Sequence, residues 1–139
     1  MPIEFQLDPS SRMISAKAYD PVTKKNWMDI FLGIKNHPER IEGMDAVFDL
    51  TEQEVNISDH YMWVFAQRMI PHITKNYIVK WAFVSSKDIT IEKIDKFASY
   101  LMRNKNMKVR GFPDVDTARK WILEDKEERF MKNPSNKAL

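Results

Sequence analysis

Ser58 and three histidines are the residues whose side chains could most directly do chemistry. Ser58 could act as a nucleophile or accept a phosphate, and His60 is the nearest candidate base. The chain has no Gly-x-Ser-x-Gly elbow, and Ser58 suits the N-cap of a following helix, which is the stronger interpretation. His37, His60 and His72 lack the spacing of a zinc site. We therefore predict no catalytic residue and no metal site, and Ser58 remains a helix cap or a regulatory phosphosite.

Composition excludes several further kinds of chemistry. The chain has no cysteine, so disulfides, thiolate metal sites and thiol catalysis cannot occur. Its three glycines form no phosphate-binding loop. The 22 basic and 20 acidic side chains give a net charge of +2, which does not indicate a dedicated nucleic-acid-binding protein. We expect a protein that is not an enzyme, needs no cofactor and binds no nucleic acid.

Large apolar side chains are the residues that the chain has in excess. Nine of its residues are methionines, and Met commonly lines adaptable apolar sites. Most of these side chains must form the core, but those on facing elements could also enclose a pocket. The predicted ligand-binding residues are Trp27, Phe31, Tyr61, Phe65, Met69, Trp81 and Phe83.

The stretch from Tyr77 to Ser85 must position these residues. It is rich in β-branched and aromatic residues and has no Gly or Pro, which predicts a central strand. One face of this strand would carry Tyr77, Val79, Trp81 and Phe83, and the other Ile78, Lys80, Ala82 and Val84. Because the second face includes a lysine, we expect helices to cover it less completely, which leaves its apolar residues available for a homodimer.

The rest of the chain predicts five strands and four helices in the order β-β-α-β-α-β-α-β-α. Helices between consecutive strands are typical of parallel strands with right-handed crossovers. The predicted strands are Ile3 to Leu7, Met13 to Tyr19, Asp45 to Leu50, Tyr77 to Ser85 and Lys108 to Phe112. Four helices are predicted. The first opens at Asp20-Pro21, and the second runs from Ser58 to Ile70. The third runs from Thr90 to Asn104, with Asp88 or Thr90 as its cap, and the fourth starts at Asp114.

These elements predict one α/β domain over residues 1–124. Its sheet should be mixed and mostly parallel with five strands, because only the first two strands form an antiparallel hairpin. The charged residues 125–139 should form a frayed helix or a disordered tail.

The segment from Val109 to Leu123 resembles the end of SpoIIAA-like domains. Those domains characteristically close with a short strand, a Phe, an acidic helix start, and then Ala and Trp-Leu on the last helix. The matching residues here are Phe112, Asp114, Asp116, Ala118 and Trp121, with Ile122 where Leu is usual. The resemblance extends over roughly Ile3 to Glu124 and implies the SpoIIAA-like fold, which is related to STAS domains and to CRAL/TRIO lipid-carrier domains.

The resemblance also implies a non-enzymatic function. Related folds hold apolar ligands between sheet and helices, or meet membranes and protein partners. We therefore predict a small apolar or lipid-like ligand. The alternative is a STAS-type regulatory module, because Asp49-Leu50-Thr51 and Ser58 occupy places similar to the strand-end Asp-Leu-Ser and the phosphorylatable Ser of that family. The usual Asp-Ser-Ser-Gly around that Ser is missing here.

The predicted helix from Ser58 to Ile70 has more apolar surface than one core-facing stripe needs. Trp63 and Val64 should project among polar residues and form an interface. We expect a homodimer, with membrane contact as the second interpretation and burial of Trp63 under the last helix as the structural alternative. The chain starts without a secretory signal and has no bilayer-length apolar run, so we expect a protein in the cytoplasm or at the membrane periphery.

Overall fold

A five-stranded sheet with strand order β1-β2-β4-β6-β7 forms the middle of the protein. The computed structural model describes residues 3–51, 53–101 and 105–131. Strand β1 (Ile3–Asp8) runs antiparallel to β2 (Met13–Ala18), and β4 (Asp45–Asp49), β6 (Val79–Val84) and β7 (Met107–Phe112) continue the sheet in parallel. The predicted α/β fold with a mixed, mostly parallel five-stranded sheet is confirmed.

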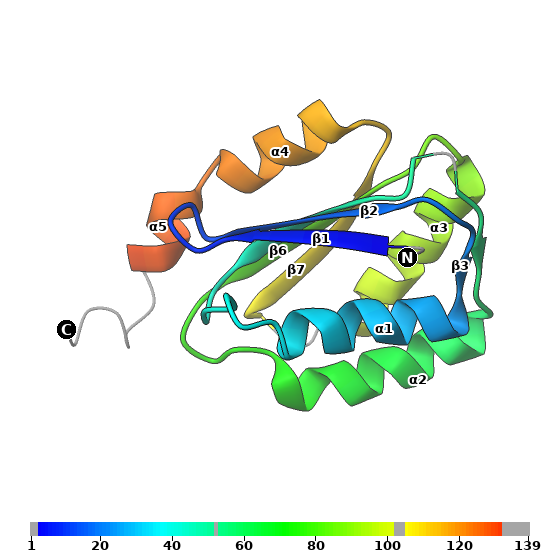
Figure 1. Cartoon of the computed structure of the whole chain (residues 1–139), viewed down its shortest axis with the longest axis horizontal. Coiled ribbons are helices and arrows are strands. Elements are labelled where there is room, and N and C mark those ends of the chain that lie inside the picture. The colour runs from blue at the N-terminus through cyan, green and yellow to red at the C-terminus, as the bar shows by residue number, and fades with distance from the viewer. Residues whose placement is uncertain (1–2, 52, 102–104, 132–139) are drawn as a thin grey trace.

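Helices cover both faces of this sheet (Figure 1). Helices α1 (Lys24–Lys35), α2 (Asp59–Met69) and α3 (Asp88–Leu101) contribute buried residues to the core on one face, and a short 3-10 helix, η1 (Ile70–His72), follows α2. Helix α4 (Val115–Leu123) packs on the opposite face, and α5 (Lys126–Met131) follows it on that side.

An aromatic cluster fills the core under α1, α2 and α3. The Trp27 ring lies 5.3 Å from Phe83 in a stacked arrangement and meets the edges of Phe65 and Phe97 at 5.9 and 5.6 Å. These four rings are at most 3% exposed. Burial of each such side chain contributes about 1.5–3 kcal/mol, so this cluster is a major source of stability.

Helix α1 begins later than the sequence predicts. Val22–Thr23 forms a short strand, β3, that pairs in parallel with β5 (Val55–Asn56), and Val22 is fully buried. Thr23 then caps the helix: the Asn26 amide donates to the Thr23 hydroxyl, and the Thr23 amide donates to the Asn26 side chain. The predicted start at Asp20-Pro21 is wrong because this two-way capping box outcompetes the single Asp cap.

The expectation of a poorly covered second sheet face is also wrong. Ala82 and Val84 are fully buried against α4, whose Ala118 and Ile122 are fully buried too. Lys80 is only 3% exposed. Its amino group donates to the Trp121 carbonyl at 2.7 Å and pairs with a carboxylate after α4, so this lysine does not mark a solvent-exposed face.

Ion pairs and hydrogen bonds between buried charged side chains hold helix α5 against the sheet. Arg129 is 5% exposed, and its guanidinium donates to both carboxylate oxygens of Asp45, at 2.8 and 3.0 Å. It also donates to Asp125 at 2.7 Å, while Lys80 contacts the same Asp125 oxygen at 2.9 Å. Lys126 pairs with Asp45 at 3.1 Å. We call these five residues the charge cluster.

Each charge in the cluster is compensated by another. Burial alone would lower the pKa of Arg129, but the Asp45 and Asp125 carboxylates outweigh burial and raise that pKa above its usual value.

The sequence predicts a frayed helix or a disordered tail after Glu124. In the structure, the first part of this segment is the packed helix α5. Residues 132–139 of that tail lie outside the described part of the chain.

Candidate ligand-binding site

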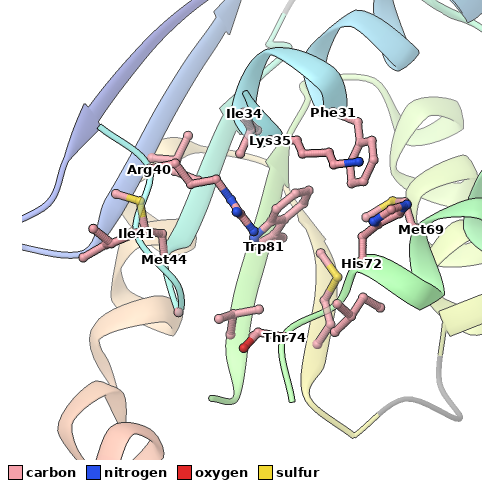
Figure 2. A pocket seen from close by; sticks show the side chains of 15 residues that line it. Phe31, Ile34, Lys35, Arg40, Ile41, Met44, Met69, His72, Thr74 and Trp81 are labelled. Carbon is pink, nitrogen blue, oxygen red and sulfur yellow. The ribbon is translucent and has the colours of Figure 1, made fainter. Parts of the chain in front are cut away.

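A pocket lies at the amino ends of β4, β6 and β7, next to the carboxyl ends of α1 and α2 (Figure 2). We call it the amino-end pocket. Its volume is about 70 Å³. It is lined by Ile14, Phe31, Ile34, Lys35, Arg40, Ile41, Gly43, Met44, Met69, His72, Ile73, Thr74, Val79, Trp81 and Met107.

The inner wall of the amino-end pocket is apolar and adaptable. Three methionines reach it from three different elements, namely Met44 before β4, Met69 at the end of α2 and Met107 at the start of β7. All three are at most 5% exposed. A Met side chain has three rotatable bonds and a polarisable sulfur, so this wall can change shape at a modest energetic cost.

The Trp81 ring forms a flat surface in the same wall. Along β6, Trp81 stands between Val79, which also lines the pocket, and Phe83, which belongs to the aromatic core cluster. The Trp81 ring lies 5.1 Å from Phe48. The Nε1 atom of Trp81 is buried and has no hydrogen-bond partner among the described residues. A buried donor without an acceptor costs free energy, so a ligand that supplies an acceptor to this indole would be favoured.

The outer rim of the amino-end pocket is basic. Lys35 ends α1, Arg40 lies in the loop that follows, and His72 ends η1; all three side chains are exposed. The Arg40 side chain extends toward Trp81 (Figure 2). His72 also contacts Phe31, with ring centroids 5.8 Å apart. No Asp or Glu is among the lining residues.

Local hydrogen bonds hold the loop that carries Arg40. The His37 amide donates to the Ile34 carbonyl at 3.2 Å, and the Arg40 amide donates to the His37 carbonyl at 3.1 Å. These bonds turn the chain sharply after α1, as the Asn36-His37-Pro38 sequence favours. Arg40 is thereby placed over the amino-end pocket.

Gly43 closes this loop at a position that only glycine fits well. Its φ is +83°, and a Cβ atom there would lie 2.3 Å from the Arg12 guanidinium and 2.7 Å from the Tyr77 ring. Arg12 donates to the Gly43 carbonyl at 3.1 Å and stacks over Tyr77 at 4.7 Å. Arg12 and Tyr77 therefore hold the end of the loop in place.

The structure brings three of the seven predicted ligand-binding residues together. Phe31, Met69 and Trp81 line the amino-end pocket. Trp27, Phe65 and Phe83 belong to the aromatic core cluster instead, and Tyr61 lies half-buried with the Lys24 amino group 4.8 Å above its ring. None of these four lines the pocket.

The sequence interpretation missed the basic rim and the other two methionines of the pocket. Lys35 and Arg40 flank a Pro-containing turn, which looked like an ordinary helix end. Met44 and Met107 each stand one residue outside a predicted strand. The one available signal was that the residues before three parallel strands converge at the same end of the sheet.

Ser58 caps α2, as predicted. The Tyr61 amide donates to the Ser58 hydroxyl at 3.2 Å, and Ser58 is exposed. Asp49, at the end of β4, is not bonded to Ser58; its carboxylate accepts from the amide and hydroxyl of Thr51. The structure thus assigns the capping role directly, and phosphorylation of Ser58 stays a prediction.

Trp63 is exposed on the outer side of α2. It is 47% exposed and stacks loosely on His60, with ring centroids 6.4 Å apart, while Val64 beside it is half-buried. The last helices lie on the opposite face of the sheet, so the structural alternative in which they cover Trp63 is wrong. Self-association through Trp63 and Val64 stays a prediction.

The described residues contain no helix long and apolar enough to cross a membrane. Their His, Asp and Glu side chains also do not gather in any group of three or more that could hold a metal ion.

The architecture is that of a SpoIIAA-like α/β domain. No protein-family model and no curated protein sequence matches the chain. Among solved structures, it is similar to an uncharacterised protein of the DUF3478 family from Shewanella loihica PV-4, whose crystal structure is described as having a SpoIIAA-like fold. The TM-score is 0.53 at 16% sequence identity, and the match covers 86% of this chain and 93% of that chain. The fold predicted from the Val109 to Leu123 segment is therefore confirmed.

Proposed function

We propose that this protein is a non-enzymatic binding protein for a small apolar or lipid-like molecule, and that the ligand occupies the amino-end pocket. The observation that carries the proposal is the wall of that pocket, in which three buried methionines converge with Phe31 and Trp81. Ligand sites are typically concave and mostly apolar, with few polar groups that fix orientation. The amino-end pocket has this composition.

The size of the pocket limits what enters it without rearrangement. Its volume of about 70 Å³ is less than half of the roughly 150 Å³ apolar cavity known to bind benzene. A short aliphatic segment fits this space. A longer chain requires Met44, Met69 or Met107 to change rotamer, which Met side chains do readily.

Native mass spectrometry of the protein as purified from cells tests the proposal. A bound small molecule, or uptake of octanoate or octanol added to the emptied protein, supports it. Ile41→Asp places a carboxylate at the pocket mouth and should abolish uptake. Leu32→Asp is the matched control, because Leu32 is 42% exposed, Ile41 is 41% exposed, and only Ile41 lines the pocket. Equal uptake by both variants, or no uptake by the wild type, would contradict the proposal.

A STAS-type regulatory module is the second candidate function. The observation that favours it is the exposure of Ser58 at the start of an eleven-residue helix, where a phosphate would be stabilised by the helix dipole. Intact-mass measurements on protein from stressed and unstressed cells check for a phosphate adduct. Absence of the adduct in both, or its persistence in Ser58→Ala, would remove Ser58 from this role.

A further inference from the structure

We infer that the ligand is an amphipathic anion, with an apolar chain that enters the amino-end pocket and a carboxylate that stays at the rim between Arg40 and Lys35. This inference rests on the proposed function and names the class of ligand. It depends on the rim, whereas the proposed function depends on the apolar wall.

The rim holds positive charge that the described part of the protein does not neutralise. Neither Lys35 nor Arg40 forms an ion pair or a side-chain hydrogen bond with any described residue. Lys80, Lys126 and Arg129 on the other side of the sheet are all paired with carboxylates. An anion at the mouth of the pocket would therefore meet two cations whose charge is still available.

Two acidic residues lie close to the rim in the sequence, and neither lines the pocket. Glu39 directly precedes Arg40, but it lines a different pocket together with His37 and Arg119. Glu42 lies one residue before Gly43, but its carboxylate accepts hydrogen bonds from the Thr74 hydroxyl and, at 2.9 and 3.1 Å, from the Asn76 amide group. It is not among the residues that line the pocket. Among the described residues, no carboxylate lines the pocket or pairs with Lys35 or Arg40, so none occupies the position proposed for the ligand.

The rim and the wall are adjacent, which favours a molecule that combines charge with an apolar chain. Arg40 extends toward Trp81, whose ring belongs to the wall (Figure 2). Lys35 directly follows Ile34 at the end of α1, and Ile34 is 4% exposed. A carboxylate between Arg40 and Lys35 would leave its chain directed at Trp81 and the methionines.

The test compares octanoate, octanol and octylamine, which share one chain and differ in charge, by calorimetric titration of the whole protein. Inorganic phosphate is a fourth probe that has charge without a chain. Octanoate should bind at least about tenfold more tightly than octanol, since a hydrogen bond to a charged group contributes enough for that factor. Octylamine and phosphate should bind more weakly still.

Variants assign the effect to the rim. Arg40→Met and Lys35→Met should each weaken octanoate binding by roughly tenfold and leave octanol binding unchanged, because only the anion uses these cations. Lys25→Met on the same helix as Lys35 is the control, since Lys25 is exposed and does not line the pocket. It should leave binding of both compounds unchanged. The advantage of octanoate should also shrink as salt is added.

The outcomes separate this inference from the proposed function. If octanol binds as tightly as octanoate, and Arg40→Met changes neither, the inference is wrong while the proposed function stands. If phosphate binds as tightly as octanoate, the rim is a simple anion site and the inference is also wrong. If no compound with an eight-carbon chain binds, both fail.

Discussion

The same strand ends serve a pocket on one face of the sheet and a charge cluster on the other. Met44 lines the amino-end pocket, and the next residue, Asp45, is the buried anion of the charge cluster. Along β6, Trp81 lines the pocket while its neighbour Lys80 points to the other face and belongs to the cluster. The alternation of side chains along a strand places these two unlike regions back to back.

The two regions differ in how their charges are used. In the charge cluster, Arg129 has both carboxylate oxygens of Asp45 and one of Asp125 as acceptors, so its charge stabilises the docking of α5. At the pocket rim, Lys35 and Arg40 have no such described partner. The paired, buried charges have a structural role here, and we propose that the unpaired charges beside the apolar pocket mark a ligand site.

The largest expected difference between the two regions is in stability. Arg129→Met leaves Asp45 buried without its bidentate partner and should lower the free energy of unfolding by about 3–5 kcal/mol. Arg40→Met removes an exposed cation and should change it by no more than about 0.5 kcal/mol. Urea denaturation measures both. Equal losses in the two variants would contradict the distinction between paired and unpaired charge.

Substitution of Ser58, at the opposite end of the sheet, should lower the free energy of unfolding by less than Arg129→Met does. Ser58→Ala removes the acceptor of the Tyr61 amide and should cost about 0.5–2 kcal/mol. Ser58→Asp keeps a capping acceptor and should recover most of that loss. Thermal or urea unfolding checks both variants. A Ser58→Ala protein as stable as the wild type would mean that the cap contributes nothing.

The charge cluster should also weaken in acid. Burial alone would raise the pKa of Asp125, but hydrogen bonds from Lys80 and Arg129 outweigh burial and lower it. The pKa of Asp125 is lower in the folded state than in the unfolded chain, where it is about 3.9. The Asp125 carboxylate therefore stabilises the fold fully at pH values above the unfolded pKa. The contribution is lost as the pH falls through the folded-state pKa.

Amide hydrogen exchange of α5 as a function of pH measures this loss. Protection of α5 in the wild type should fall below about pH 4. In Asp125→Asn, protection should already be lower at neutral pH and should respond less to acid. A variant with the same acid response as the wild type would show that another group controls α5.

A change in stability as small as that of Arg40→Met is expected at Trp63. Trp63→Glu alters a side chain that is 47% exposed and should change the free energy of unfolding by no more than about 0.5 kcal/mol. If Trp63 and Val64 form a homodimer interface, light scattering should show a dimeric wild type and a monomeric variant. A wild type that is monomeric at high micromolar concentration would remove the dimer.

The sequence predicted the fold well because its signals are local. Alternation in the first hairpin, the apolar stripe of Trp27, Ile30 and Ile34, and the unbroken strand around Trp81 each indicate one element, and the order of elements restricts the topology. The β3–β5 pair was missed because each strand has only two residues and its partner lies far away in the chain.

The candidate site was predicted only in part because it depends on which elements converge. Phe31, Met69 and Trp81 were recognised as large apolar residues, but nothing local separates them from Trp27 or Phe83 in the core. Nothing local in the sequence shows that Lys80 is buried either, because its burial depends on Asp125, 45 residues further along the chain. Long-range pairing of charges leaves no periodic signal in the sequence.

The central claim, that ligands enter the amino-end pocket, is tested most directly by methionine methyl NMR during titration with octanoate. The nine methionines of the chain provide probes throughout the fold. Met44, Met69 and Met107 line the pocket, whereas Met62, on α2, is buried outside the pocket, and Met13 packs on the opposite face of the sheet. We predict saturable shifts of the three pocket methyls and little change at Met62 and Met13. Shifts confined to Met62 or Met13, or no saturable shift at any methyl, would contradict the account.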